Sequence, residues 1–212
     1  MEVKCNFEIG ELGECKAAYY TGFVSSIKNP GTSVSVFKGI HQESKTNRDV
    51  EGLSFFGKKV EQFPRGIQNF FPILTCLQIA DCGLKKIARR DLLGLENLKF
   101  LFLNQNKLKA LPDNLFKNMS KLEELDFSGN KITRMSSNLF KPLNKEILNL
   151  ADFRGIPSID YRYKSDDGET SLDVLLRKID ESCELSEERS TDKKYREKYH
   201  LLMKSSEELY VN

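Results

Sequence analysis

The sequence predicts an α/β solenoid: a short curved parallel sheet with a β cap at its N-terminal end and a helical cap at its C-terminal end. Three observations predict it. Apolar residues recur every 24 residues in the middle of the 212-residue chain, the first 49 residues do not follow this period, and a helical apolar pattern comes after it. Such self-similarity is typical of architectures in which each unit buries its apolar face against its neighbours.

Composition excludes two classes of partner. Lys and Arg number 33 and Asp and Glu 31, so the net charge is only +2, with 39% apolar and 30% charged residues. A dedicated nucleic-acid binder usually carries a strong basic excess. No apolar run approaches the length of a membrane span. We therefore expect neither nucleic acid nor a membrane span.

The repeat defines the middle of the chain, residues 50–145, as about four units. Its marker residues are Leu53, Leu77, Leu101 and Leu125, and five further apolar columns keep the same spacing. The units have the form L-x-x-L-x-L-x-x-N-x-L, with clear copies beginning at Leu98 and Leu122. In this pattern L-x-L predicts a short strand whose alternate side chains point into a shared core.

A polar position follows each predicted strand. Asn106 and Asn130 occupy it in the third and fourth units, where an Asn side chain can bond backbone groups that a sharp turn leaves without partners. Cys82 replaces Asn in the second unit, and Lys58 does so in the first. We therefore expect Cys82 to be a buried, inert thiol.

Residues 1–49 predict an N-terminal cap with a β-hairpin. Alternation indicates strands at 19–24 and 33–37, joined by a turn at 29–31. Cys5 and Cys15 flank two glycines that suit a turn, so their thiols could face each other across a hairpin. One interpretation is a disulfide, which implies an oxidising compartment. The other is two free thiols in a cytosolic strand pair.

The C-terminal part is predicted in two segments. Residues 146–183 hold a degenerate last repeat, whose frame is ambiguous by one or two residues, and a capping helix. That helix has one apolar face, formed by Leu172, Leu175, Leu176 and Ile179. Residues 184–212 form a charged, partly helical tail, either solvated or used to bind a partner or a second copy.

These residues resemble a known family, the extracellular leucine-rich-repeat proteins, the class of Toll-like receptor ectodomains. The whole arrangement is most similar to short secreted insect proteins of that class. The likeness covers about residues 3–183. It is carried by the cysteine-bearing cap, by a lead-in loop containing Gly39, His41, Lys45, Asn47 and Val50, and by segments 63–67 and 70–72. The resemblance implies extracellular recognition, with innate immunity as one setting.

One departure from that group concerns the C-terminal cap. In such proteins a cysteine in the last repeat pairs with one in the capping helix, but Ser158 stands at the matching position here. Cys183 then lacks this partner. It becomes a candidate free or intermolecular thiol. A homodimer could form through this thiol or through the tail.

The sequence offers little for catalysis. It has two histidines, no phosphate loop, no nucleophile-elbow motif and no zinc-protease motif. Cys76 and Cys82 are too far apart for a metal-ligand pair, and residues 166–169 lack the spacing of a calcium loop. His41 is expected to bond locally within its loop. We therefore predict no enzyme, no cofactor and no metal.

The face of the sheet that points away from the core is the predicted binding surface, because rigid strands hold its side chains in ordered columns. Alternation places Phe100 and Phe102 there as exposed aromatics beside an acidic edge, a combination typical of protein or peptide contacts. The predicted contact residues are Phe56, Gln78, Phe100, Phe102, Asn104, Glu124 and Asp126. In the alternative, a cap loop or the tail covers the two phenylalanines.

Localisation stays open between two settings. No signal-peptide pattern follows Met1, so the chain is either cytosolic or a mature secreted chain with an added Met. Asn118 begins a glycosylation sequon on the predicted convex side. Our first hypothesis is a secreted module that binds a protein or peptide, and the second is an intracellular scaffold or enzyme-regulating subunit. An enzyme is the third.

Overall fold

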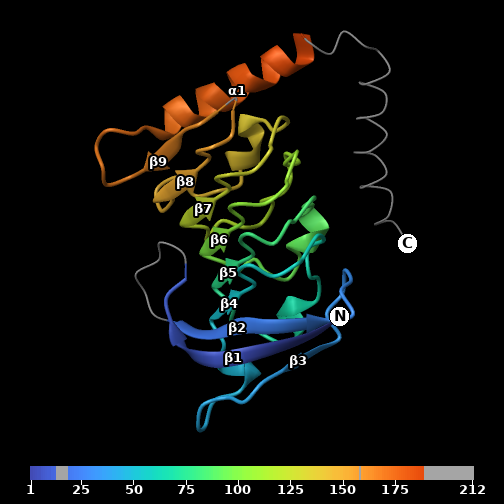
Figure 1. The fold of residues 1–212 in the computed structure, drawn as a ribbon. Helices are drawn as coiled ribbons and strands as arrows, with labels where there is room; N and C mark the ends of the chain where they lie inside the picture. Colours follow the sequence, from blue (N-terminus) through green and yellow to red (C-terminus); the bar gives the residue numbers. More distant parts are fainter. Residues whose placement is uncertain (13–18, 158, 189–212) are drawn as a thin grey trace.

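The structure is a computed structural model that describes residues 1–12, 19–157 and 159–188, with residues 183–188 described by their backbone alone. Within this part of the chain, one sheet runs through the whole molecule in the order β3-β1-β2-β4-β5-β6-β7-β8-β9. Figure 1 shows the β1–β2 hairpin across one end of the stack and helix α1 across the other. The strands are β1 (Glu2–Gly10), β2 (Tyr19–Lys28), β3 (Val36–Lys38), β4 (Gly52–Ser54), β5 (Cys76–Gln78), β6 (Phe100–Phe102), β7 (Glu124–Asp126), β8 (Leu150–Asp152) and β9 (Arg162–Lys164).

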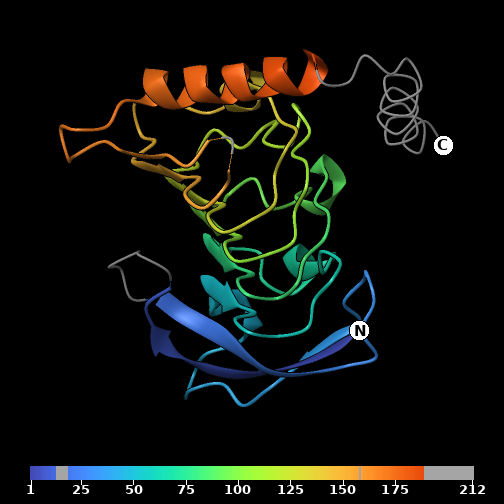
Figure 2. The ribbon, with the colours of Figure 1, turned by 45° about the horizontal axis from the view of Figure 1, so that its top comes forward.

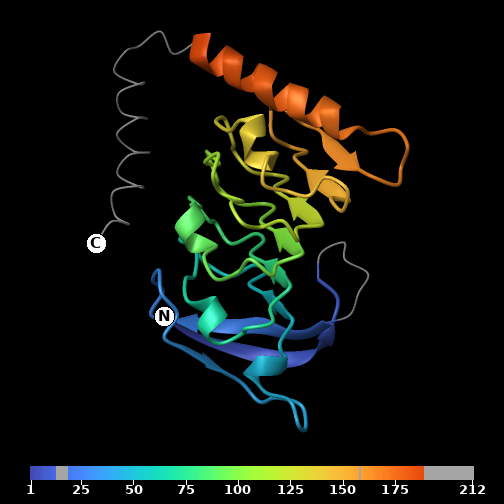
Figure 3. The ribbon, with the colours of Figure 1, turned by 180° about the vertical axis from the view of Figure 1, so that it is seen from behind.

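The predicted fold class, an α/β solenoid with a β cap and a helical cap, is confirmed. Strands β4 to β8 are parallel, and the marker leucines of the first four units pair in one register and are fully buried. The return segments, which lead from the turn after one strand back to the next strand, carry the short 3-10 helices η2 (Ile67–Asn69), η3 (Arg89–Asp91) and η4 (Ser137–Phe140), and a further one, η1 (Asn47–Asp49), lies in the loop before β4. Strands line one side of the stack and return segments the other (Figures 2 and 3).

Buried asparagines hold successive coils together, as predicted. The Oδ1 of Asn106 accepts the backbone N–H groups of Cys82 and Leu84 at 3.1 and 2.9 Å, and its Nδ2 donates to the Ile79 carbonyl at 2.6 Å. Asn130 repeats this arrangement one unit later. Each side chain satisfies backbone groups that would otherwise be buried without a partner.

Cys82 takes over the donor role in the second unit. Its thiol donates to the Phe55 carbonyl, the position that corresponds to the Asn106–Ile79 bond, and to the Ala80 carbonyl at 3.2 Å. The residue is 3% exposed, and burial raises the pKa of its thiol to about 11. The prediction of a buried thiol is confirmed, and the raised pKa favours the thiol over the reactive thiolate form.

The N-terminal cap pairs its strands differently from the prediction. The β1 strand runs antiparallel to β2, while β3 lies parallel to β1 on the outer edge instead of forming a hairpin with β2. The residue opposite Cys5 is Val24, and the predicted pairing of Cys5 with Cys15 involves a residue outside the described ones. Cys5 is a free, buried thiol whose pKa is raised to about 12 by burial, and Cys15 lies outside the described residues.

The last repeat is longer than the others. Asp126 pairs with Asp152, so the period lengthens from 24 to 26 residues before β8. Strand β9 then turns back antiparallel to β8, and α1 (Leu172–Glu188) covers the end of the core with Leu175 and Ile179. The helix continues past its predicted end at residue 183. The predictions for the tail from residue 189 onward and for the Cys183 thiol concern parts of the chain outside the description.

Candidate functional site

The candidate site is the concave face, which we define as the side of strands β4 to β9 that points away from the core. Strand alternation places three columns of side chains on it. They are Gly52, Cys76, Phe100, Glu124 and Leu150; then Ser54, Gln78, Phe102, Asp126 and Asp152; then Phe56, Ala80, Asn104, Ser128 and Arg154. These columns divide into two halves with different surfaces.

The covered half lies toward the hairpin, over β4 to β6. Leu12, from the segment after β1, is only 2% exposed and packs on this face with Cys76, Phe100 and Phe102. Tyr19 adds an aromatic contact, with its ring centroid 6.0 Å from that of Phe100. This apolar cluster is separate from the main core, on the opposite side of the sheet.

Two predicted contact residues are therefore not exposed. Phe100 is 7% and Phe102 is 2% exposed, so the prediction of open aromatics is wrong, and the alternative of a covering cap segment describes them better. The physical reason is the apolar character of the two rings, which a neighbouring apolar side chain can bury. A Cβ at Gly52 would lie 2.4 Å from the Thr21 Oγ1 and 3.0 Å from Leu12, so glycine leaves room for this close packing.

The open half lies toward α1, over β7 to β9, and it is charged. Glu124, Asp126 and Ser128 are partly exposed on or just after β7. The Oδ1 of Asp126 accepts the backbone N–H of Ser128 at 2.8 Å, which fixes the position of its carboxylate. These side chains form an acidic stripe on a rigid strand.

Beside this stripe lies a basic one. Asp152 is 2% exposed and is neutralised by Arg154, whose Nη2 lies 2.5 Å from the Asp152 Oδ2, and by Arg162, whose Nε lies 3.5 Å away. The Arg154 side chain remains 53% exposed. Lys164 follows on β9 and pairs with Asp166 at 2.9 Å. The open half thus presents acidic and basic groups side by side.

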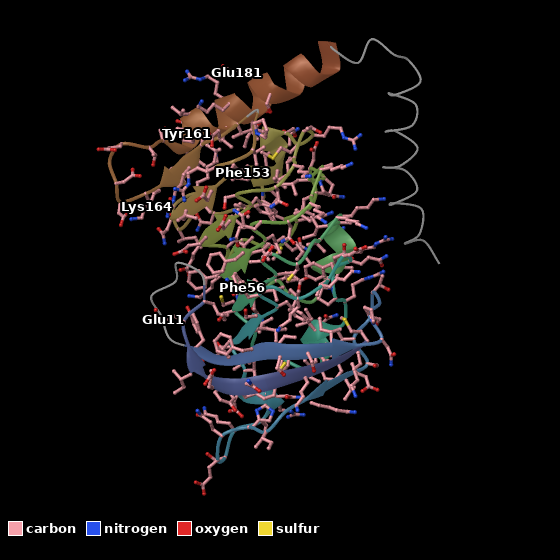
Figure 4. The ribbon with its side chains drawn as sticks, viewed as in Figure 1. Glu11, Phe56, Phe153, Tyr161, Lys164 and Glu181 are labelled. Carbon is pink, nitrogen blue, oxygen red and sulfur yellow. The ribbon has the colours of Figure 1, made fainter. Side chains whose placement is uncertain are left out.

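The remaining predicted residues lie between or beside these halves. Gln78 is partly exposed, and its Oε1 accepts the Ser54 hydroxyl at 2.7 Å. Asn104 is partly exposed at the boundary, and Phe56 is 61% exposed just after β4. Figure 4 places Phe56 and Glu11 toward the hairpin end, and Tyr161 and Lys164 toward α1.

Sequence reasoning missed the basic stripe and the covering leucine. Arg154 and Arg162 could not be placed because the last repeat departs from the 24-residue period and β9 reverses direction. Leu12 gave one usable signal, since it is an apolar residue in the polar context Glu11-Leu12-Gly13-Glu14. No repeat pattern, however, connects that position with β5 or β6.

The structure also shows where His41 and Asn118 lie. His41 bonds within its loop, as predicted, with its Nε2 2.9 Å from the Asn47 Oδ1, and it also bonds outside the loop, with its Nδ1 3.0 Å from the Tyr20 hydroxyl on β2. Asn118 is exposed in a return segment, away from the concave face.

Within the described residues, no group of three or more His, Cys, Asp or Glu side chains could hold a metal ion. The same residues include no helix long and apolar enough to cross a membrane.

Comparison with known proteins bears on the repeats. The family model described as "Leucine rich repeat" matches residues 72–132 and 96–152. Among solved structures, a chain of the Drosophila Toll–Spätzle complex is similar, with 22% identity over 52% of this chain and 16% of that chain and a TM-score of 0.43. An internalin from Listeria monocytogenes shows 17% identity over 47% and 29% of the two chains, with a TM-score of 0.32.

This chain therefore spans less than a third of either of those two chains. A search of curated proteins finds no match. The matched repeats support a protein-binding recognition module, since solenoids offer extended concave binding surfaces. The chain carries leucine-rich repeats, and its fold is a leucine-rich-repeat solenoid.

Proposed function

We propose that this chain is a non-enzymatic recognition module that binds a protein or peptide on the open half of its concave face. The observation that carries the proposal is the pair of adjacent charged stripes on rigid strands, Glu124 and Asp126 beside Arg154 and Arg162. Complementary charges on a partner would fix its orientation and suppress wrong partners. The preferred ligand is a polypeptide segment with both charge signs.

The covered half contributes indirectly to this site. Because Leu12 occupies the face above β5 and β6, a ligand meets the strands from β7 onward, with Asn104 at the boundary. Phe56 and Gln78 lie next to the covered cluster, after β4 and at the end of β5, and become a secondary contact region. Phe100 and Phe102 lie beside the site on the adjacent strand, where Leu12 covers them, and they do not touch the ligand.

An extracellular setting, with a role in recognition or innate immunity, forms part of this proposal. Its support is the resemblance of the cap and the lead-in loop to secreted repeat proteins, together with the exposed sequon at Asn118. A glycan there would stand clear of the concave face.

A second candidate is an intracellular scaffold or enzyme-regulating subunit. The buried thiols of Cys5 and Cys82, which form no disulfide, favour it, because reduced cysteines are usual in the cytosol. Counting thiols in the denatured, unreduced protein separates the two settings. Three free thiols would indicate one bridge and an oxidising compartment, and five would indicate a reduced interior protein.

The test of the binding site uses two matched double variants. Glu124→Gln/Asp126→Asn removes the acidic stripe and keeps an acceptor for the Ser128 N–H. Glu146→Gln/Asp113→Asn makes the same charge change on exposed residues of the return segments. In pull-downs from extracellular fluid, we expect the first variant to lose partners that wild type and the second variant retain. Equal recovery by all three proteins would remove the site assignment.

A further inference from the structure

A basic surface separate from the concave face lies along the turns that follow β4 to β7. We name it the lysine ridge, and it consists of Lys59, Lys85, Lys86, Lys107, Lys109 and Lys131, all exposed. Because parallel strands end at the same edge of a sheet, their turns lie one above another. Figure 2 shows the coils stacked in chain order between the β1–β2 hairpin and α1.

Backbone hydrogen bonds fix the register of the ridge. The N–H of Lys107 donates to the Leu84 carbonyl at 2.8 Å, and the N–H of Lys131 donates to the Leu108 carbonyl at 2.9 Å. Neighbouring coils are therefore spaced by about 4.8 Å, the usual distance between paired strands. Lys107 and Lys109 flank the buried Leu108, so alternation directs both side chains outward.

The ridge is positive overall, because its six lysines outnumber the two neighbouring acidic residues, Glu61 and Asp81. Glu61 pairs with Lys85 at 2.6 Å, and the lysine holds the pKa of that carboxyl below its usual value. Among the described residues, Lys59, Lys86, Lys107, Lys109 and Lys131 have no carboxylate within ion-pair distance. Like charges at such spacing repel, and an external polyanion relieves this repulsion.

The ridge also offers a place for anionic groups. A shallow hollow of about 310 Å³ lies at the turn glycines Gly57 and Gly83, and its charged lining consists of Lys58, Lys59 and Lys107 together with the acidic Glu61 and Asp81. A Cβ built at either glycine would meet nothing within 4 Å, so the backbone there is open to an approaching group. Lysine ammonium groups on flexible stems suit a ligand whose charges are irregularly spaced.

We propose that the lysine ridge binds a linear sulfated polysaccharide. Sulfate groups keep their charge at any physiological pH, and a long sugar chain can follow the ridge from coil to coil. Single-stranded nucleic acid fits less well, because such sites combine basic grooves with several stacking aromatics. In the described part of the chain, Phe56 is the one large aromatic with high exposure.

The test measures binding of a defined heparin oligosaccharide by titration calorimetry at several salt concentrations. The ridge variant is Lys107→Gln/Lys109→Gln/Lys131→Gln. The matched control, Lys117→Gln/Lys141→Gln/Lys145→Gln, removes the same charge from exposed lysines of the return segments. We expect the ridge variant to bind at least about tenfold more weakly and its salt slope to fall by about three. The control should bind within about twofold of wild type.

Three results would overturn the proposal: no saturable heparin binding by wild type, equal weakening in both variants, or tighter binding of a single-stranded oligonucleotide than of heparin. Thermal unfolding should be unchanged in both variants, since all six lysines are exposed. The proposal does not depend on the concave face. Glu124→Gln/Asp126→Asn is therefore expected to leave heparin binding intact.

Discussion

Phe102 and Asp126 occupy the same column of one sheet on adjacent strands, yet they have different environments. Phe102 is 2% exposed beneath Leu12, whereas Asp126 is partly exposed in a charged stripe. The repeat gives both residues the same backbone position. The N-terminal cap, which is outside the repeat, decides which of them can meet a ligand.

The largest expected effect comes from truncating the buried ring of Phe102, which tests the contrast between the two positions. Phe102→Ala should destabilise the protein by about 3 kcal/mol or more, because it removes a buried aromatic and leaves a cavity. Asp126→Asn, in the same column, should change the unfolding free energy by less than about 1 kcal/mol. Urea unfolding measures both. Similar effects at the two positions would show that the two halves do not differ as described.

The next largest loss of stability is expected from truncating Leu12, the residue that covers Phe100 and Phe102. Leu12→Ala should cost about 2 kcal/mol and expose the thiol of Cys76, which is fully buried beneath it. Alkylation followed by mass mapping should therefore label Cys76 faster in this variant. Cys82 should stay unlabelled, since its thiol is buried on the other side of the sheet.

A matched control for this experiment is Ile9→Ala. Ile9 is also near the end of β1, but it is 66% exposed, so its loss should change stability by no more than about 0.5 kcal/mol. If Cys76 labelling is equally slow in wild type and Leu12→Ala, Leu12 does not cover the face.

The smallest effect on stability is expected at Asp167, in the turn between β9 and α1. The Asp167 carboxylate accepts the Thr170 N–H at 2.9 Å and its hydroxyl at 2.8 Å, and these bonds hold the pKa of Asp167 below its usual value. A carboxyl with a lower pKa in the folded state stabilises the fold above its unfolded-state pKa. That contribution disappears as the pH falls through the folded-state pKa.

Asp167→Asn should accordingly lower stability slightly at neutral pH and flatten its decline in the acid range. The pH dependence of the unfolding midpoint for both proteins measures this. A variant that loses stability as steeply as wild type below the ordinary aspartate pKa would contradict the assignment.

The repeated part of the fold was predictable from sequence because every unit solves the same packing problem. The spacing of Leu53, Leu77 and Leu101 predicted strand position and register, and Asn106 predicted how the turns are bonded. Alternation also identified which side chains point away from the core. These features depend on short-range pattern and on contacts between equivalent positions.

The exposure of the site was not predictable in the same way. Leu12 reaches β6 through tertiary packing that no period encodes, so Phe100 and Phe102 were wrongly expected to be open. Arg154 and Arg162 reach the open half because the last repeat gains two residues and β9 reverses direction. Both errors arise where the caps replace the repeat.

The most direct test of the binding account places a photo-crosslinking amino acid, benzoylphenylalanine, at Asn104 or, in a second protein, at Asn138. Asn104 borders the open half, and Asn138 is exposed on η4 among the return segments. After irradiation with the partner recovered by pull-down, we expect a covalent adduct from position 104 and none from position 138. Adduct formation at position 138 alone, or equally at both positions, would contradict binding on the concave face.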